Sequence, residues 1–285
     1  MLLSVCNTIL TMQDSIRDAL RSGAAGSAAM ATQVTALMWL RTTVNYQYRH
    51  GGGTRAALRA LHRDGGVRRF YRGYPVALMH APLARFGDVA SYSAAKKMEH
   101  LPAWQQTALA TGGSSAWKLL LMPLDTLKTS LQVHGSARAL AAKVRAGGPG
   151  ALFHGYAGAA GAGALGYYPW FFTYGWLDRR LPRFTEDTPL IARLGRHASM
   201  GFAASAVSDT VSNAVRVVKV CRQTHPTPIS YIEAARRVIS EDGVRGLLGR
   251  GLRTKIVANG VQGATFSVAW RCIESWWKDE KKEAQ

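Results

Sequence analysis

Few residues in this sequence have the types and spacing that catalysis or metal binding requires. The three cysteines, Cys6, Cys221 and Cys272, are widely separated and form no CxxC pair, which argues against a disulfide framework and against a zinc site. No Ser/His/Asp set, pair of carboxylates or cluster of metal ligands stands out along the chain. We therefore expect a protein that is not an enzyme and that holds neither a metal nor a catalytic cofactor.

One glycine motif matches a nucleotide-binding pattern. The segment from Gly161 to Gly166 reads Gly-Ala-Gly-Ala-Leu-Gly and satisfies GxGxxG. No strand pattern precedes it, and the surrounding residues form an apolar helical stretch. Close packing between helices, which small residues permit, is therefore favoured over dinucleotide binding.

The distribution of charge, rather than its total, indicates the class of protein. A formal net charge of +19 would suit a nucleic-acid partner or an anionic membrane surface. However, no Asp, Glu, Lys or Arg occurs from Ser22 to Leu40 or from Ala146 to Leu177. A stretch of roughly 20 residues without charge can cross a bilayer as a helix. A soluble basic helical protein would place charges on the wet face of every helix. We therefore expect a membrane protein with no nucleic-acid partner.

The charge-free stretches belong to a pattern that recurs three times. Three segments end in the same way, each closing with a glutamine: Thr35–Gln47, Met122–Gln132 and Asn213–Gln223. Each is followed by a basic stretch and a glycine-rich turn, and the turns occupy residues 64–73, 147–155 and 242–251. A further apolar helix follows each turn. The repeated unit is therefore a long helix, a short basic surface helix, a glycine turn and a second long helix.

The second segment shows which family this pattern resembles. Pro123-Leu-Asp125-Thr-Leu-Lys128, closed by Gln132, resembles the mitochondrial carrier signature P-x-[DE]-x-x-[KR]. The turn Phe70-Tyr-Arg-Gly73 resembles the second signature of that family. The resemblance extends from about Ser22 to Trp277. It implies an all-α membrane protein with six transmembrane helices, arranged as three pseudo-symmetric two-helix repeats with short surface helices on the matrix side.

The same resemblance divides the chain and orients it. The expected segments are an N-terminal part (1–21), three repeats (22–100, 101–188 and 189–277) and a polar tail (278–285). Most basic residues lie in the loops after the first, third and fifth helices. By the positive-inside rule these loops face the matrix. We therefore expect a multi-pass protein of the mitochondrial inner membrane with both termini on the intermembrane-space side.

In the family, each odd-numbered helix carries an acid that pairs with the base of the next helix and closes a matrix gate. Here the acid positions are Leu40, Asp125 and Arg216, the base positions are Thr43, Lys128 and Lys219, and the proline positions are Met38, Pro123 and Ala214. The family pairing places Leu40 opposite Lys128, Asp125 opposite Lys219 and Arg216 opposite Thr43. Only the Asp125–Lys219 ion pair is therefore expected to remain.

The gate on the other side of the membrane has changed in a similar way. The even-numbered helices of the family carry an aromatic residue followed by an acid. In this chain the aromatic is kept at Tyr92, Tyr174 and Trp270, whereas the acid is lost after each of them. A ring of ion pairs at this end is therefore not expected.

The resemblance also implies substrate contact points and lipid sites on the even-numbered helices. The contact points fall at His80, Ala162 and Ala258, with Gly163 and Asn259 alongside, although a lone histidine is more often structural than a ligand. Arg85 and Lys255 are expected in or near the cavity, because charged groups in membrane helices face water or protein. Cardiolipin is the structural lipid expected at the starts of these helices, Arg72–Gly73, His154–Gly155 and Arg250–Gly251. Simple interfacial positive charge is the alternative at each.

Two functions fit these observations. Both gates have lost charges while the features of helix packing remain. This favours an accessory or structural subunit of a larger inner-membrane assembly, such as a respiratory-chain or ATP-synthase complex, with other subunits as partners. The alternative is an active transporter that exchanges a small metabolite by alternating access. The sequence leaves both hypotheses open.

Overall fold

The computed structural model describes residues 30–96, 98, 101–182 and 189–262, and these residues form helices and turns without a strand. The chain is helical at 30–50 and again at 252–262. Between these segments, the helices in chain order are α2 (Thr54–Arg63), α3 (Gly66–Phe70), α4 (Tyr74–Lys96), α5 (Ala103–His134), α6 (Arg138–Gly147), the 3-10 helix η1 (Pro149–Phe153), α7 (Tyr156–Arg180), α8 (Leu190–Thr224) and α9 (Tyr231–Gly249).

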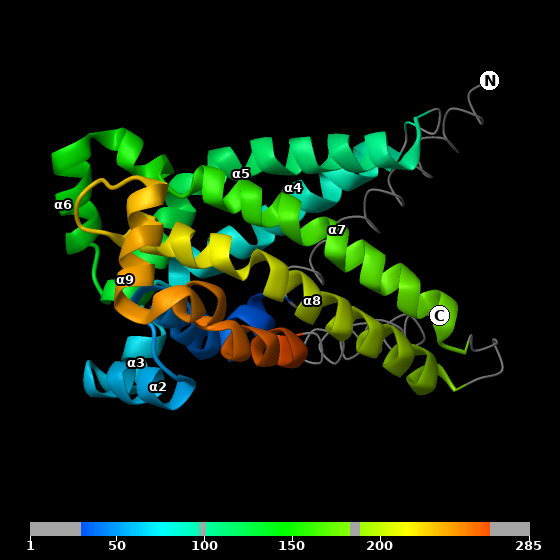
Figure 1. Cartoon of the computed structure of the whole chain (residues 1–285), viewed down its shortest axis with the longest axis horizontal. Helices are drawn as coiled ribbons and strands as arrows, with labels where there is room; N and C mark the ends of the chain where they lie inside the picture. The colour runs from blue at the N-terminus through cyan, green and yellow to red at the C-terminus, as the bar shows by residue number, and fades with distance from the viewer. Residues whose placement is uncertain (1–29, 97, 99–100, 183–188, 263–285) are drawn as a thin grey trace, which may run out of the picture.

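The long helices run roughly along the long axis of the molecule, and the short helices gather at one end (Figure 1). Helix α4 packs on α5, α7 packs on α8, and α5 contacts both α7 and α8. At the end that carries α2, α3, α6 and α9, a core cluster joins the helix at 30–50 to α8 and α9 through Val44, Tyr48, Val217 and Val238. This packing closes one end of the bundle.

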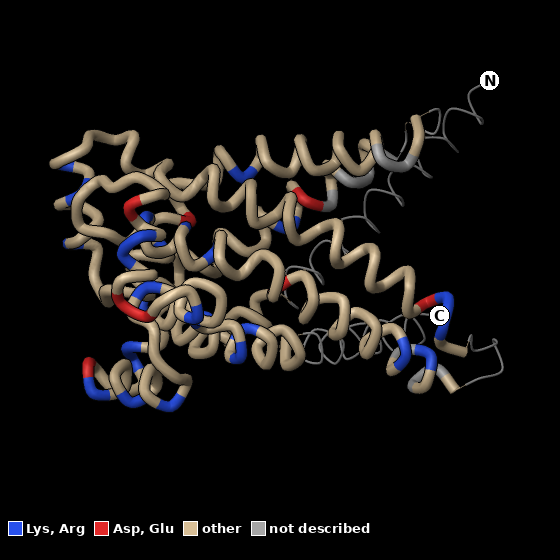
Figure 2. Tube along the Cα trace, in the orientation of Figure 1, with Lys and Arg blue, Asp and Glu red and all other residues tan. Residues whose placement is uncertain are grey.

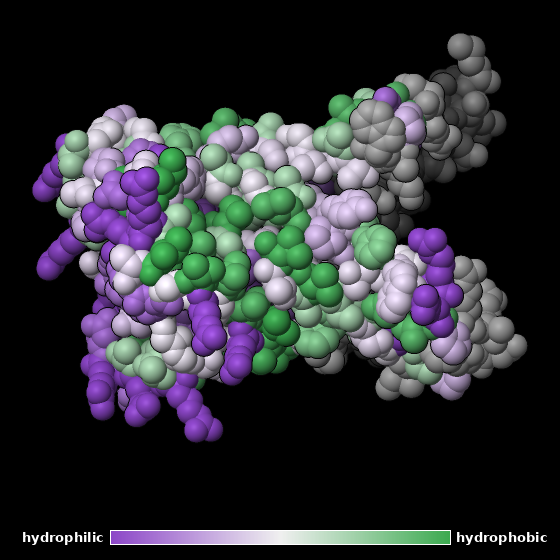
Figure 3. All heavy atoms as spheres, in the orientation of Figure 1, coloured by the Kyte–Doolittle hydropathy of each residue, from purple (hydrophilic) through white to green (hydrophobic). Residues whose placement is uncertain are grey.

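Charged and apolar side chains occupy different parts of the surface. Lys and Arg are concentrated at the end formed by α2, α3, α6 and α9, and a smaller group lies at the far end of α7 and α8 (Figure 2). Between these ends, apolar side chains cover much of the face in view (Figure 3). Among the described residues, no helix combines the length and the apolarity that a membrane-spanning segment needs.

Three glycines let a turn approach a long helix that is distant in the sequence. A Cβ atom added at Gly73 would lie 3.0 Å from the Leu131 Cβ of α5. One added at Gly155 would lie 2.9 Å from the Gln223 side chain of α8, and one at Gly251 would lie 3.0 Å from the ring of Tyr48. The same kind of contact thus recurs three times, and each turn packs on a different long helix.

Three buried cations stabilise the carboxyl ends of the same long helices. Arg69 donates to the carbonyl oxygens of Gln132 (2.9 Å) and Val133 (2.7 Å) at the end of α5. The Lys143 Nζ donates to the carbonyl oxygen of Arg222 (2.5 Å) near the end of α8, and Arg250 donates to the carbonyl oxygen of Arg49 (3.4 Å). The last carbonyl groups of a helix lack partners within the helix and carry partial negative charge. The three cations therefore satisfy helix ends that would otherwise be buried without partners.

Candidate functional site

Two adjoining pockets lie inside the bundle. The larger has a volume of about 570 Å³ and is lined by residues of α4, α5, α7 and α8. The smaller has a volume of about 330 Å³ and is lined by the helices at 30–50 and 252–262 together with α4, α5 and α8. Four residues line both pockets: His80, Asp125, Arg216 and Lys219. The two pockets therefore meet at a set of polar side chains.

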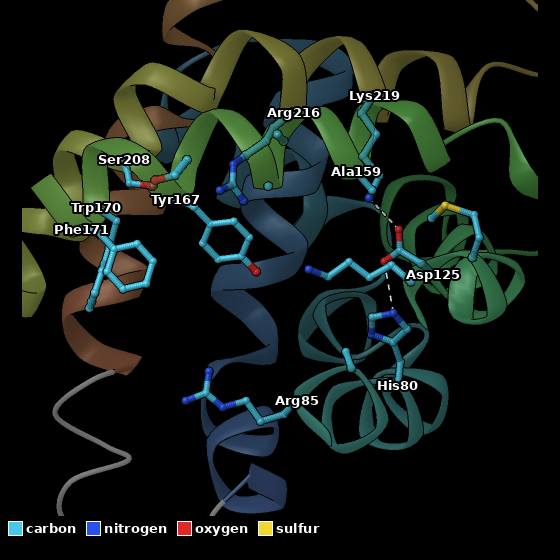
Figure 4. A pocket seen from close by; sticks show the side chains of 16 residues that line it. His80, Arg85, Asp125, Ala159, Tyr167, Trp170, Phe171, Ser208, Arg216 and Lys219 are labelled. Carbon is cyan, nitrogen blue, oxygen red and sulfur yellow. Dashed lines mark hydrogen bonds and ion pairs between the residues drawn. The ribbon is translucent and has the colours of Figure 1, made fainter. Parts of the chain in front are cut away.

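The larger pocket has an ionic side and an aromatic side. His80, Asp125 and Lys219 gather at one side of it, and Trp170 and Phe171 lie at the other (Figure 4). Lys118 also lines this pocket and forms an ion pair with Asp88 at 3.0 Å. A solute inside it would contact both charged groups and ring faces.

Asp125 is the centre of the shared cluster. It is buried, and its Oδ2 atom accepts from the Lys219 Nζ at 2.6 Å and from the Gln223 side chain at 3.3 Å. Its Oδ1 atom accepts from the Lys128 Nζ at 2.6 Å and lies 3.7 Å from the His80 Nε2. One carboxylate therefore serves two lysines, and the cluster keeps an excess of positive charge.

A second cluster surrounds Asp209 on α8. Arg216 forms an ion pair with Asp209 at 3.4 Å, and the Asn259 amide donates to the same carboxylate. The Lys255 Nζ donates to the Asn259 Oδ1 at 3.1 Å, and the Arg41 guanidinium donates to the Gln262 Oε1 at 3.2 Å. Among the described residues, Arg41 and Lys255 thus bond to neutral amide oxygens and not to carboxylates.

At the predicted matrix gate, the Asp125–Lys219 ion pair forms, and the residues of the other two positions contact different partners. The Asp125–Lys219 ion pair forms across α5 and α8, as the family pattern implies. Leu40 packs against Leu37 and Ala258, and Lys128 turns to Asp125, because an apolar side chain offers a lysine no charge. Arg216 pairs with Asp209, and the Thr43 hydroxyl bonds to the Trp39 carbonyl of its own helix. Pro123 lies within α5, where its missing amide hydrogen removes one helical hydrogen bond.

The expected contact points all line the cavity. His80 borders both pockets, Ala162 and Gly163 line the larger pocket, and Ala258 and Asn259 line the smaller one. Arg85 lines the larger pocket and Lys255 lines the smaller one, as the sequence suggested. The structure thus brings together side chains that are far apart along the chain. It does not assign a ligand to any of them.

The expected lipid positions differ from one another in their surroundings. Arg72 is exposed beside Gly73, so its charge is accessible. The carbonyl oxygen of His154, next to Gly155, accepts from Arg222 at 2.7 Å and from the Tyr231 hydroxyl at 2.9 Å. Arg250, next to Gly251, is 4 % exposed and forms ion pairs with Glu241 and Asp242, both acids of its own segment. The guanidinium of Arg250 is therefore already neutralised.

At the opposite end, Asp178 and Arg196 form an ion pair at 2.8 Å between α7 and α8. The hydroxyl of Tyr174, one of the kept aromatic residues, lies 2.9 Å from the His197 Nδ1. The side chain of Tyr92 and residue Trp270 lie outside what the structure describes. The Asp178–Arg196 ion pair thus links α7 to α8 at the end where the family's acids are lost.

Sequence reasoning missed several of the charged groups in the cavity. Arg41 and Lys118 line the pockets. Asp88 forms an ion pair with Lys118, and Asp209 forms one with Arg216. Arg41 directly follows a gate position, and one helical residue changes the direction of a side chain by about a quarter of a turn. The sequence motif fixes the gate positions along the helix, but it does not show which neighbouring side chains face the cavity.

The charged side chains that line the two pockets are mostly cations. No group of three or more metal-ligating side chains occurs among residues 30–96, 101–182 and 189–262. Seven cations line the two pockets: Arg41, Arg85, Lys118, Lys128, Arg216, Lys219 and Lys255. Asp125 is the one acid among the described lining residues. Asp88 and Asp209 do not line the pockets, but they form ion pairs with Lys118 and Arg216. Such a lining attracts negatively charged solutes.

Comparison with protein families identifies a relationship in the last part of the chain. Residues 192–281 match the family described as mitochondrial carrier protein, and this range contains α8, α9 and the helix at 252–262. No curated protein matches the chain. The match covers the last third of the chain, and this part is similar to the mitochondrial carrier family.

Proposed function

We propose that this protein carries a small anionic solute across the mitochondrial inner membrane by alternating access. The single observation that supports this most strongly is the cationic lining of the central cavity, described above. Charged groups are expensive inside a membrane protein and are kept mainly where they line a path or bind a ligand. A binding protein for anions explains why so many cations face one another across two pockets.

The architecture proposed for this function has six transmembrane helices in three repeats, 22–100, 101–188 and 189–277. Three observations support it: the family match, the three glycine turns that pack on successive long helices, and the three buried cations at the helix ends. The apolar surface between two charged ends fits a bilayer (Figures 2 and 3). The more basic end would face the matrix, with both termini on the opposite side.

The gating proposed for this carrier uses the Asp125–Lys219 pair. This pair joins α5 to α8 next to the floor of both pockets. An ion pair that closes a gate must exchange its partners when the solute binds. Because Asp125 serves two lysines, a bound anion could take over one of them without leaving a charge unpaired. Cardiolipin at the starts of the even-numbered helices remains part of the proposal, and Arg72 is the position with an accessible charge.

An accessory subunit of a larger inner-membrane complex is the second candidate. The observation that favours it is the loss of charge at gate positions: Leu40 is buried among apolar side chains, and Thr43 bonds to its own helix. A subunit that does not transport needs no ring of ion pairs. However, an accessory subunit has no use for a cationic cavity. We therefore favour the transporter over the accessory subunit.

Reconstitution into liposomes tests the proposed transport. Purified protein in proteoliposomes should take up radiolabelled anions, such as citrate, malonate or phosphate, faster than protein-free liposomes do. Uptake of lysine and glucose should remain at the background rate. Absence of anion uptake by folded protein would count against the transporter. Co-migration with a respiratory or ATP-synthase complex after native extraction and mass spectrometry would then support the accessory subunit.

A further inference from the structure

The smaller pocket collects cations from separate helices around a single lining acid. Arg41 comes from the helix at 30–50, Lys128 from α5 and Lys255 from the helix at 252–262. Arg216 and Lys219 of α8 complete the set, and Asp125 is the acid among the described residues that line the pocket. Arg41, Lys128 and Lys255 line the same pocket, so their like charges repel one another. Mutual repulsion of these charges therefore destabilises the empty pocket.

The charges near the pocket can be assigned to pairs. Asp209 neutralises Arg216, and Asp125 is divided between Lys128 and Lys219 at equal distances of 2.6 Å. One lysine charge of that group is left over. Arg41 and Lys255 donate to amide oxygens at 3.2 and 3.1 Å, and the Asn259 amide that accepts from Lys255 also donates to Asp209. Five cations line this pocket against the two carboxylates Asp125 and Asp209, so a net excess of three positive charges remains among the described residues.

Position 40 explains why Lys128 must share an acid. The residue expected to provide the partner of Lys128 is Leu40, which is 4 % exposed and packs against Leu37 and Ala258. With no carboxylate there, Lys128 bonds to the acid that already holds Lys219. Leu40 thus replaces the acid of the family pattern. As a result, a negative charge is lacking beside a pocket that a ligand can enter.

We propose that the smaller pocket binds a compact anion with two or three negative charges, of the carboxylate or phosphate class, between Arg41, Lys128 and Lys255. The anion provides the negative charge that position 40 lacks. When it is bound, Lys128 is neutralised by the ligand, and Asp125 pairs with Lys219 alone. This inference rests on the proposed function, because it names the class of solute and ties its binding to the ion pair of the gate.

The size of the pocket and its other polar groups fit such a ligand. A volume of about 330 Å³ is at the small end of the range for ligand pockets. Asn45, Asn259 and Gln262 also line it. Asn45 and Asn259 already donate to Gln132 and Asp209, but each side-chain amide carries a second N–H that can orient a carboxylate or phosphate oxygen. Lysine and arginine form their strongest hydrogen bonds with ionised oxygens. The site therefore selects for charge first and for compactness second.

Calorimetric titration of the full chain in detergent tests this inference without requiring transport. Acetate, malonate and citrate carry one, two and three carboxylates, and at matched ionic strength their affinity should rise in that order. Lys128→Gln and Lys255→Gln should each weaken citrate binding at least about tenfold, because each removes a charged partner from an enclosed site. Lys128→Arg keeps the charge and should largely restore binding.

Arg138→Gln is the matched control. It removes the same charge from the exposed face of α6, and Arg138 lines neither pocket, so citrate affinity should change by less than about twofold. Three results would overturn the inference: no binding of any of these anions, equal affinities for acetate and citrate, or an equal loss in Arg138→Gln and Lys128→Gln. Citrate binding without uptake in proteoliposomes would contradict transport and leave the site intact. Anion uptake with unchanged binding in Lys128→Gln would contradict the site and leave transport intact.

Discussion

Asp125 illustrates how a single residue can hold two parts of the bundle together. Its carboxylate bonds to Lys128 one turn along the same helix and to Lys219 and Gln223 of α8. A buried carboxylate is stable only if charged partners and hydrogen bonds replace its hydration. Because Asp125 is the acid that pairs with both lysines among the described residues, each member of the cluster depends on the others. Removing the Asp125 carboxylate should therefore lower the free energy of unfolding more than removing either lysine charge.

We expect Asp125→Asn to lower the free energy of unfolding by about 3 kcal/mol, because it leaves buried lysines without a counter-charge. Thermal unfolding in detergent, followed by tryptophan fluorescence, measures this. Glu233→Gln is the control, since the Glu233–Arg237 pair is exposed and should be worth less than about 0.5 kcal/mol. Equal destabilisation by the two variants would contradict this account of Asp125. The double variant Asp125→Asn/Lys219→Gln should recover part of the loss.

At the scale of helices, the three turns and the three buried cations determine how the segments fit together. Each turn glycine packs on a different long helix, and each cation satisfies the carboxyl end of one. The cations come from different sequence positions: Arg69 lies four residues before Gly73, Lys143 lies twelve before Gly155, and Arg250 directly precedes Gly251. A common structural role is therefore filled by residues that do not align.

Gly73 combines a left-handed backbone with close packing, and both should make substitution costly. Its φ is +82°, and an added Cβ would lie 3.0 Å from Leu131 Cβ and 3.3 Å from the Lys128 carbonyl oxygen. Gly52 has the same φ of +82° but no neighbour within 4 Å of the added Cβ. Gly52→Ala should therefore cost about 1 kcal/mol of unfolding free energy, from the backbone alone. Gly73→Ala should cost clearly more, and equal losses in a denaturant or thermal assay would show that the contact with α5 is unimportant.

Lys143 gives the stability of the surface helix α6 a pH dependence. Burial, together with the nearby charge of Arg222, lowers the pKa of Lys143 from 10.5 to about 8. Below pH 8 the amine is protonated in both the folded and the unfolded chain, so the penalty for burying its charge is present in full. As the pH rises from about 8 towards 10.5, only the unfolded chain keeps the proton, and the folded state is favoured.

The contribution of Lys143 to unfolding free energy should accordingly increase over this range. The measurement is thermal unfolding of wild type and Lys143→Met at pH values from 7 to 10. As the pH rises, the unfolding free energy of wild type should increase relative to that of Lys143→Met. A constant difference would contradict the lowered pKa. Arg138→Met, which changes an exposed cation of the same helix, is the control for general effects of charge.

For the whole molecule, the sequence predicted the class of fold better than the arrangement of its charges. Its Pro123–Lys128 motif and repeated glycine turns predicted a helical protein of the carrier type, and the helical structure and the family match over residues 192–281 agree. His80, Ala162 and Ala258 could be placed beside a cavity because they lie at a fixed distance from each turn glycine. Arg41, Lys118 and Asp209 could not, because helix rotation decides which charges face a cavity. Lys128 was expected to lie opposite Leu40, and only three-dimensional packing shows that it shares Asp125.

Membrane insertion is a prediction for the whole molecule, and extraction tests it. After alkaline carbonate treatment of mitochondrial membranes, the protein should remain in the pellet with integral membrane proteins. Its basic end carries several exposed arginines, among them Arg55, Arg59 and Arg63 of α2, which could hold a peripheral protein on anionic lipid. Release into the supernatant by carbonate would therefore identify peripheral binding and contradict the six-helix membrane architecture.

Counterflow in proteoliposomes tests the central claim, that the cavity is a path for an anion, most directly. Liposomes loaded with citrate should accumulate external radiolabelled citrate when they contain the wild-type protein. Ala162→Trp, which fills the larger pocket from a position that is 5 % exposed, should abolish the accumulation, whereas Ala142→Trp on the exposed face of α6 should not. The same test applies to malonate and phosphate. Accumulation no greater than in protein-free liposomes for all three anions, or accumulation that Ala162→Trp leaves unchanged, would contradict the account.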